Sequence, residues 1–179
     1  MLKRLFKKKK SAAEAPLPDP DKISVLFVCM GNICRSPSAQ GVFAKLIEEQ
    51  GIKEALYLDS AGTVPYHVGK EPDARAQAEA GERGYDLSGY RARLVTAADC
   101  EAFDYVVVMD NTNMLDVRAV SPKRYWEKIH LLMDYSPGPP GREVPDPYSG
   151  EQADFSTALD LIEKAAQGLI NQIRRDHRL

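Results

Sequence analysis

The feature that most constrains this chain is an apolar strand that leads directly into a cysteine-to-arginine loop and then into a helix. Residues 23–28 are apolar on both faces, which is typical of a central parallel strand covered by helices. Ser36 suits the N-cap of the next helix, and Pro37 suits its first helical position. The loop from Cys29 to Ser36 is therefore predicted to direct backbone N–H groups and a positive helix end inward, where they would bind an anion.

Two side chains of this loop suit phosphate chemistry. Backbone donors, a helix N-terminus and a guanidinium favour the thiolate form of Cys29, which makes it the expected nucleophile. Arg35 follows six positions later, and its planar fork can bind two phosphoryl oxygens at once. Gly31 is expected to adopt a positive φ and to let the backbone approach the phosphate. Asn32 also tolerates the left-handed region and can lock the loop through its amide.

Three motifs occur together along the chain. They are Cys-x4-Cys-Arg-Ser-Pro after the strand at residues 29–37, Asp-Pro-Tyr at residues 146–148, and Ser-Ala-Gly-Thr at residues 60–63. Together they resemble the loop, the general-acid motif and the second strand exit of the low-molecular-weight protein tyrosine phosphatases. The resemblance extends from residue 24 to the C-terminus. It implies an enzyme that hydrolyses phosphotyrosine in proteins through a phosphocysteine, without a metal or another cofactor.

The chemistry of this reaction suggests roles for further polar residues. Expelling a phenolate requires a proton donor, and Asp146 lies in a Pro- and Gly-rich loop from which it can donate the proton and later activate water. Asp110 is expected to cap a helix and to orient Arg35. Ser36 and Ser60 are interpreted as hydrogen-bonding supports of the loop, and the Ser36 hydroxyl also as a group that steadies the leaving thiolate.

The remaining site residues follow from the resemblance and from the loop itself. Tyr66 and Tyr148 would form the pocket walls, and His67 would tune substrate preference. One interpretation of Cys34 is that it is simply a packed core residue. The other is that it traps oxidised Cys29 as a disulfide, for which it is well placed, and this would make the enzyme redox-sensitive. The phosphate-binding loop as a whole comprises Met30, Gly31, Asn32, Ile33, Cys34 and Ser36.

The rest of the chain alternates between patterns typical of strands and of helices. Further strands are expected at residues 56–59, 103–109 and 129–133, and helices after the loop, at 73–83, at 97–101, after Asp110 and through the apolar stripe from Phe155 to Ile173. Gly51 and Gly84 are expected to end the first two helices. This order predicts a doubly wound α/β fold, with a four-stranded parallel sheet, helices on both faces and the phosphate-binding loop after the first strand.

The N-terminal segment differs from the rest in charge. Residues 1–10 hold six of the 24 Lys and Arg residues and no acid, so the remainder of the chain is acidic overall. We expect residues 1–22 to be a disordered basic extension and residues 23–179 to be the phosphatase domain. The extension is either a solvated tail or a tether to an anionic membrane surface, and no motif for nucleic acid accompanies it.

The cysteine content and the lack of long apolar runs limit which cofactors and which cellular location we expect. Three cysteines make neither a disulfide framework nor a four-ligand zinc set, so no metal is expected. The chain has no run of about 18 apolar residues and no apolar signal segment. We therefore expect a cytoplasmic protein, peripheral at a membrane if the basic extension acts as a tether.

Rival functions exist within and outside this family. Phosphoarginine hydrolysis is one rival, but related enzymes with that activity carry Thr where this chain has Ile33. The larger Ile33 favours an aryl substrate, which could be phosphotyrosine in a protein or a small aryl phosphate. Arsenate reduction needs further cysteines, and Cys100 stands alone. A non-catalytic phosphotyrosine-binding module would not need Cys29, Arg35 and Asp146 together.

The chain departs from the family pattern in two places. Many relatives have a His near Tyr90 that hydrogen-bonds the loop Asn; here the sequence is Tyr-Arg-Ala-Arg at 90–93, which leaves the group that supports Asn32 open. Ser149 stands where some relatives carry a second Tyr after Tyr148. The rim of the pocket is expected to be more open as a result.

Overall fold

The fold is a single parallel sheet between two layers of helices. The structure is a computed structural model that describes residues 17–179, so the expectations for residues 1–16 lie outside the described residues. The sheet has the order β2-β1-β3-β4, and all three neighbouring pairs are parallel. Its strands are β1 (Ile23–Cys29), β2 (Leu56–Gly62), β3 (Tyr105–Val108) and β4 (Ile129–Leu131). The predicted α/β class and four-stranded parallel sheet are confirmed.

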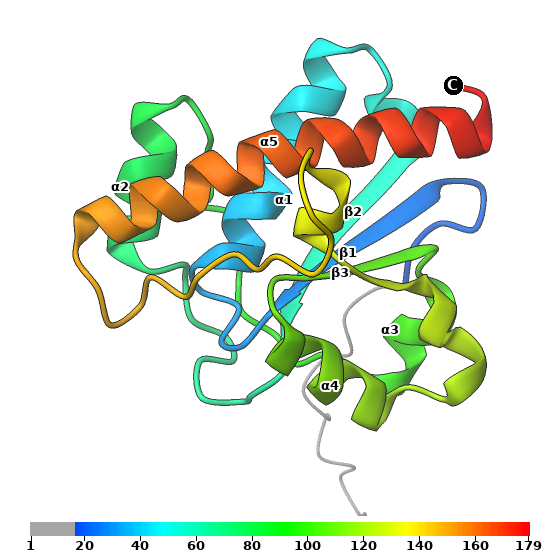
Figure 1. Ribbon diagram of the computed structural model, residues 1–179, viewed down its shortest axis with the longest axis horizontal. Coiled ribbons are helices and arrows are strands. Elements are labelled where there is room, and N and C mark those ends of the chain that lie inside the picture. Colours follow the sequence, from blue (N-terminus) through cyan, green and yellow to red (C-terminus); the bar gives the residue numbers. More distant parts are fainter. Residues whose placement is uncertain (1–16) are drawn as a thin grey trace, which may run out of the picture.

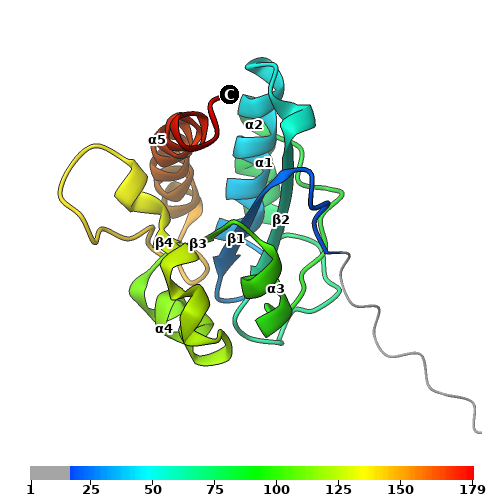
Figure 2. The ribbon, with the colours of Figure 1, turned by 90° about the vertical axis from the view of Figure 1, so that its right-hand side faces the viewer.

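Both faces of the central strand are buried, as its apolar sequence predicts. Val25 and Phe27 pack in one core cluster, and Leu26 and Val28 pack in the other. The first cluster lies beneath α1 (Arg35–Glu49) and α5 (Gln152–His177), whereas the second lies beneath α3 (Ala97–Ala102) and α4 (Asn111–Val120). Figure 2 shows these two pairs of helices on opposite sides of the strands. The fold is therefore doubly wound.

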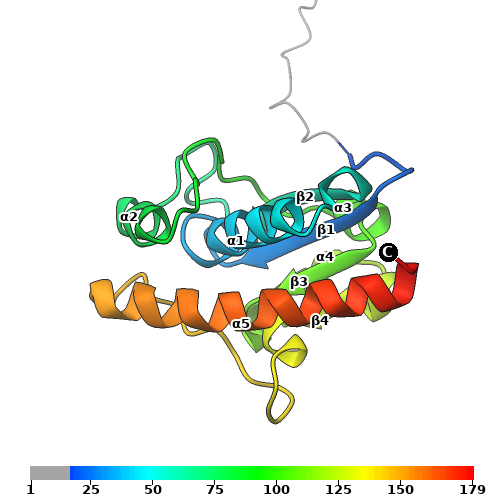
Figure 3. The same ribbon diagram turned by 90° about the horizontal axis from the view of Figure 1, so that it is seen from above.

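One further α-helix and three short 3₁₀ helices complete the described part of the chain. Helix α2 (Ala74–Glu82) contacts both α1 and α5, and α5 runs along the length of the domain, as Figures 1 and 3 show. Short 3₁₀ helices occur at Lys53–Ala55, Lys123–Lys128 and Leu132–Tyr135. No helix in residues 17–179 is both long and apolar enough to cross a membrane.

Asp110 and two glycines lie at helix ends as the sequence predicts, and Asp73 is a further cap. The carboxylates of Asp73 and Asp110 accept backbone N–H groups at the starts of α2 and α4. Gly51 and Gly84, with φ of 70° and 79°, follow the ends of α1 and α2. These positions need the left-handed conformation that glycine adopts without strain.

The bounds of three strands differ from the prediction. Strand β2 continues past the expected end at residue 59 to Gly62, because its last three residues pair with residues 27–29 of β1. Strand β3 is shorter than the expected 103–109, and β4 ends before the expected residue 133. After β4 the chain turns into the 3₁₀ helix Leu132–Tyr135, which packs against α5. Packing of the following segment therefore ends β4, and local strand propensity does not decide it.

The contact between α5 and the Leu132–Tyr135 turn requires a glycine. A side-chain carbon at Gly168 would overlap the carbonyl oxygen of Tyr135. Helix α5 can approach this turn closely only because position 168 has no side chain.

Replacing Gly168 by Ala is therefore expected to destabilise the protein by about 1–3 kcal/mol, the usual cost of overpacking. Gly81 in α2 is the matched control, because a carbon added there meets nothing within 4 Å. Gly81→Ala is expected to stabilise the protein by roughly 0.5–1 kcal/mol through its higher helix propensity. Urea unfolding followed by circular dichroism measures both changes. Destabilisation of equal size by the two substitutions would contradict this account.

Candidate active site

The loop that follows β1 holds Cys29 at the bottom of a cavity. The cavity has a volume of about 140 Å³, and the Cys29 side chain is almost fully buried. The backbone N–H of Asn32 donates to its sulfur at 3.3 Å, and the Ser36 hydroxyl lies 3.1 Å from the same sulfur. The residues that line the cavity are Cys29, Met30, Gly31, Ile33, Cys34, Arg35, Val64, Tyr66, His67, Asp146 and Tyr148.

The start of α1 differs from the prediction. The helix begins at Arg35 with Cys34 at its N-cap, and no side chain caps it, so Ser36 is not the N-cap. The Ser36 hydroxyl instead accepts a hydrogen bond from Asn32 Nδ2 and faces Cys29. It therefore does not accept an N–H group at the start of α1. Pro37 becomes the third helical residue, where an N–H has no intrahelical partner to lose.

Gly31 also differs from its predicted conformation. Asn32 has a φ of 54°, whereas Gly31 is not among the residues of positive φ. A side-chain carbon at position 31 would lie 2.9 Å from Cδ2 of His67, so the glycine leaves room for the His67 ring where it stands. The left-handed turn of the loop is thus formed by Asn32, whose short polar side chain tolerates it.

Arg35 lies buried in the wall of the cavity and has three hydrogen-bond partners. Its guanidinium donates to Asp110 Oδ2 at 2.6 Å, to the carbonyl oxygen of Val144 at 3.0 Å and to Asp146 Oδ2 at 2.9 Å. Burial alone would lower the pKa of Arg35, but attraction to Cys29 and the bond to Asp110 raise it above its usual value. Arg35 is therefore a permanent positive charge with a fixed orientation.

Asp146 lies at the rim of the cavity, on the loop before α5. Its side chain is 40% exposed, and it bridges Arg35 and the backbone N–H of Tyr148. Solvent and a bound substrate can both reach this carboxylate. A carboxyl in this place can exchange a proton with either one.

Arg75, which the sequence analysis did not identify, holds the loop that carries Asp146. Its guanidinium donates to the carbonyl oxygens of Tyr148 and Gly150, and it stacks on the rings of Phe155 and Tyr148. Its carboxylate partner, Asp73, donates its own backbone N–H to the carbonyl oxygen of Ile33. Arg75 therefore links the loop of Asp146 to the loop of Cys29.

Aromatic side chains form the mouth of the cavity. Tyr66 is 73% exposed and Tyr148 is 48% exposed, and the rings of His67 and Tyr148 lie 6.0 Å apart. The aliphatic side chain of Val64, which the sequence did not indicate, completes this wall. The mouth suits a flat apolar group that leads down to the anion site.

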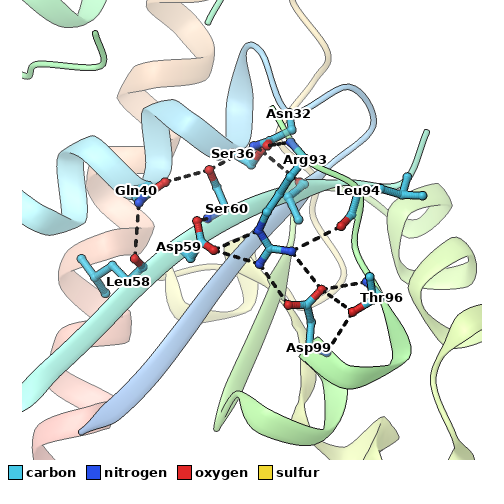
Figure 4. A network of polar contacts seen from close by, with 11 residues as sticks. Asn32, Ser36, Gln40, Leu58, Asp59, Ser60, Arg93, Leu94, Thr96 and Asp99 are labelled. Carbon is cyan, nitrogen blue, oxygen red and sulfur yellow. Dashed lines mark hydrogen bonds and ion pairs between the residues drawn. The ribbon is translucent and has the colours of Figure 1, made fainter. Parts of the chain in front are cut away.

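A chain of polar side chains supports the loop from behind (Figure 4). Asn32 Nδ2 donates to the hydroxyls of Ser36 and Ser60, at 2.8 and 3.0 Å, and the Ser60 hydroxyl donates to Gln40 Oε1. The backbone N–H of Arg93 donates to Asn32 Oδ1 at 2.9 Å. The group that supports Asn32 is therefore a backbone amide, and Gln40 joins the network without a signal in the sequence.

The other two cysteines are buried and unpaired. Burial, followed by the charge of Asp73, raises the pKa of the Cys34 thiol, and burial likewise raises the pKa of the Cys100 thiol. Both are therefore protonated at neutral pH. Within residues 17–179 no three His, Cys, Asp or Glu side chains cluster in a way that would hold a metal ion.

Comparisons with known proteins agree with this architecture. The model of the low molecular weight phosphotyrosine protein phosphatase family matches residues 24–179. The human low molecular weight phosphotyrosine protein phosphatase is 43% identical over 151 residues, which cover 83% of this chain and 94% of that protein.

Solved structures give the same result. A protein tyrosine phosphatase from Entamoeba histolytica superposes with a TM-score of 0.83 at 37% identity, over 88% of this chain and 100% of that one. YfkJ from Bacillus subtilis superposes with a TM-score of 0.82 at 34% identity, over 87% and 96% of the two chains.

The fold and these matches define an enzyme of the protein tyrosine phosphatase class. Within that class, the chain belongs to the low molecular weight phosphotyrosine protein phosphatase family. The family, the hydrolase class and the fold predicted from the sequence are confirmed. The roles of the individual site residues stay predictions.

Proposed function

We propose that this enzyme hydrolyses phosphotyrosine in proteins through a phosphocysteine intermediate. The observation that carries this proposal is that the Cys29 sulfur, the Arg35 guanidinium and the Asp146 carboxylate line one cavity with an aromatic mouth. The cavity orders these groups from its bottom to its rim, as an aryl phosphate requires. The phosphoryl group would lie against the loop amides, and the ring between Tyr66 and Tyr148.

In the first step, the Cys29 thiolate attacks phosphorus, the S–P bond forms and the bond from phosphorus to the phenolic oxygen breaks. Asp146 donates its proton to that oxygen, so a neutral tyrosine leaves. Arg35 and the loop N–H groups bind the equatorial phosphoryl oxygens. Asp146 already contacts Arg35 in this structure, so the general acid and the phosphate clamp lie side by side.

In the second step, the Asp146 carboxylate removes a proton from water, which attacks the phosphocysteine. The S–P bond breaks and inorganic phosphate and the thiolate are released. The Ser36 hydroxyl, 3.1 Å from the sulfur, can donate to the thiolate as it leaves. Fixed donors aimed at the developing charge supply the stabilisation throughout both steps.

The positions of two residues bear on the rival reactions. Ile33 lines the cavity, which keeps its wall apolar and favours an aryl group over a phosphoarginine. Cys100 packs with Leu26 and Val28, on the face of the sheet opposite to the core cluster of Cys29. It is therefore unsuited to pass on a disulfide from Cys29 in arsenate reduction. Placement in the cytoplasm and contact of residues 1–10 with an anionic membrane stay predictions.

Replacing Cys29 by Ser is expected to abolish turnover of p-nitrophenyl phosphate without added metal, because this environment does not ionise a hydroxyl as it does a thiol. Arg35→Lys is also expected to lose most of the activity, since a point charge cannot grip two oxygens. Steady-state kinetics on folded proteins measures both. Activity of Cys29→Ser near that of the parent would overturn the assignment of Cys29 as the nucleophile, and with it the phosphocysteine mechanism.

Replacing Asp146 by Asn is expected to slow hydrolysis of a phosphotyrosine peptide by about a hundredfold or more, because the expelled oxygen then lacks its proton donor. Phosphorylation of the enzyme by p-nitrophenyl phosphate should slow much less, since that leaving group departs more easily unprotonated. Single-turnover kinetics separates this step from water attack. Equal losses on the two substrates would remove Asp146 as the acid, and Asp110 would be tested next.

Mild peroxide is expected to inactivate the enzyme through a disulfide between Cys29 and Cys34. Thiol reductants should break this disulfide and restore the activity. Cys34 follows in the same loop and is a protonated, buried thiol, so it would react only once Cys29 is oxidised. Intact-mass and peptide analysis detects the bond, and Cys34→Ser is the control that should oxidise irreversibly. Sulfinic or sulfonic acid at Cys29 with Cys34 still free in the parent would refute this protective role.

A further inference from the structure

Arg93 holds together three segments of the chain behind the active site. Its guanidinium donates to Asp59 Oδ2 at 2.9 Å and to both carboxylate oxygens of Asp99, at 2.9 and 3.0 Å. Asp59 lies in β2, and Asp99 lies in the first turn of α3, where it forms a capping box with Thr96. Figure 4 shows the guanidinium between these two carboxylates. The side chain of Arg93 is therefore fixed at both ends of its planar fork.

The backbone of Arg93 is fixed as well. Its carbonyl oxygen accepts the N–H of Gly62 at 2.8 Å, at the point where β2 ends. Its N–H donates to Asn32 Oδ1. The Arg93 backbone thus lies between the exit of β2 and the phosphate-binding loop, and its guanidinium adds two carboxylate contacts to the backbone hydrogen bonds that hold this segment.

The bond from Arg93 sets the direction of the hydrogen bonds that the Asn32 amide makes. A backbone N–H can only donate, so the amide atom of Asn32 that faces it is the oxygen, and Nδ2 must donate to Ser36 and Ser60. At the other end, Gln40 Nε2 donates to the Leu58 carbonyl, which leaves Oε1 to accept from Ser60. Two backbone groups therefore determine the orientation of both amides.

This direction has a consequence at the Cys29 sulfur. Because the Ser36 oxygen accepts from Asn32, the Ser36 hydroxyl hydrogen is free to point to another acceptor. Its two candidate acceptors are the Cys29 sulfur at 3.1 Å and the Ala61 carbonyl oxygen at 3.3 Å. A thiolate is the stronger acceptor of the two, because hydrogen bonds to an ionised group are about twice as strong.

We propose that Arg93 is a positioning residue of the active site: through its two carboxylate partners it holds the N–H that orients Asn32, and through Asn32 and Ser36 it directs a hydroxyl at the Cys29 sulfur. The proposal rests on Cys29 being the nucleophile. It assigns to this arginine, which is remote from the cavity wall, a share in stabilising the thiolate both before attack and as it leaves phosphorus.

The test compares Arg93→Met with Arg83→Met. Arg83 is also a partly buried arginine, and it pairs with three carboxylates, those of Glu79, Asp160 and Glu163, but it contacts no residue of the loop network. Both variants lose a guanidinium that bridges carboxylates, so both are expected to unfold more easily. Only Arg93→Met should also change the chemistry of Cys29.

Two readouts separate a positioning role from a merely structural one. The rate of Cys29 alkylation by iodoacetamide, followed by peptide mass analysis, is measured against pH, and its midpoint should move upward in Arg93→Met. The kcat for p-nitrophenyl phosphate should fall about ten- to hundredfold, as expected when a reacting group is misplaced. Arg93→Lys should lie between the parent and Arg93→Met, and Arg83→Met should match the parent in both readouts.

A double variant tests the route through Ser36. Ser36→Ala should move the alkylation midpoint upward by itself, and adding Arg93→Met should then produce little further shift. Folded Arg93→Met that is alkylated like the parent would overturn the proposal, as would fully additive shifts. If Arg93→Met does not fold, the same readouts on Arg93→Lys decide. Alkylation needs no turnover, so failure of the phosphatase assay would count against the proposed function and leave this test intact.

Discussion

The buried guanidinium of Arg35 is the interaction on which the rest of the site depends. It extends from the start of α1 and is bound by the end of β3 through Asp110 and by the loop before α5 through Val144 and Asp146. Removing such a charge from water is costly unless every donor finds a partner. The three partners come from two segments far from Arg35 in the sequence, so this one side chain links the start of α1 to both of them.

Burial of the central strand explains why the site is rigid. Residues 25–28 of β1 have no exposed surface, and the two cores fill both sides of the sheet. Cys29 is the next residue, so its sulfur is placed by a strand that cannot shift without disrupting both cores. In the loop that follows, Asn32 provides the left-handed turn, and its side chain is held by Ser36 within the loop and by Ser60 and the Arg93 backbone outside it.

Two further arginines make the same kind of contact but serve different parts of the site. Arg75 connects the loop of Asp146 to the N-terminus of α2, and Arg93 connects the exit of β2 to α3 and to Asn32. In both cases the planar fork binds a carboxylate with two donors, which fixes direction as well as distance. The rings of Tyr66 and Tyr148 are the most exposed part of the cavity wall, at its mouth.

The sequence alone determined the family, the parallel α/β fold, the helix cap at Asp110 and the loop that carries Cys29, because strand burial, capping and loop chemistry are local patterns. Tertiary structure decided the ends of the strands, the role of Ser36 as a partner of Asn32, and the contacts of Arg75 and Arg93. Arg93 meets Asn32 across 61 positions, and Arg75 meets Tyr148 across 73. No local pattern encodes such pairs, since they form only when packing of the helices on the sheet brings the segments together.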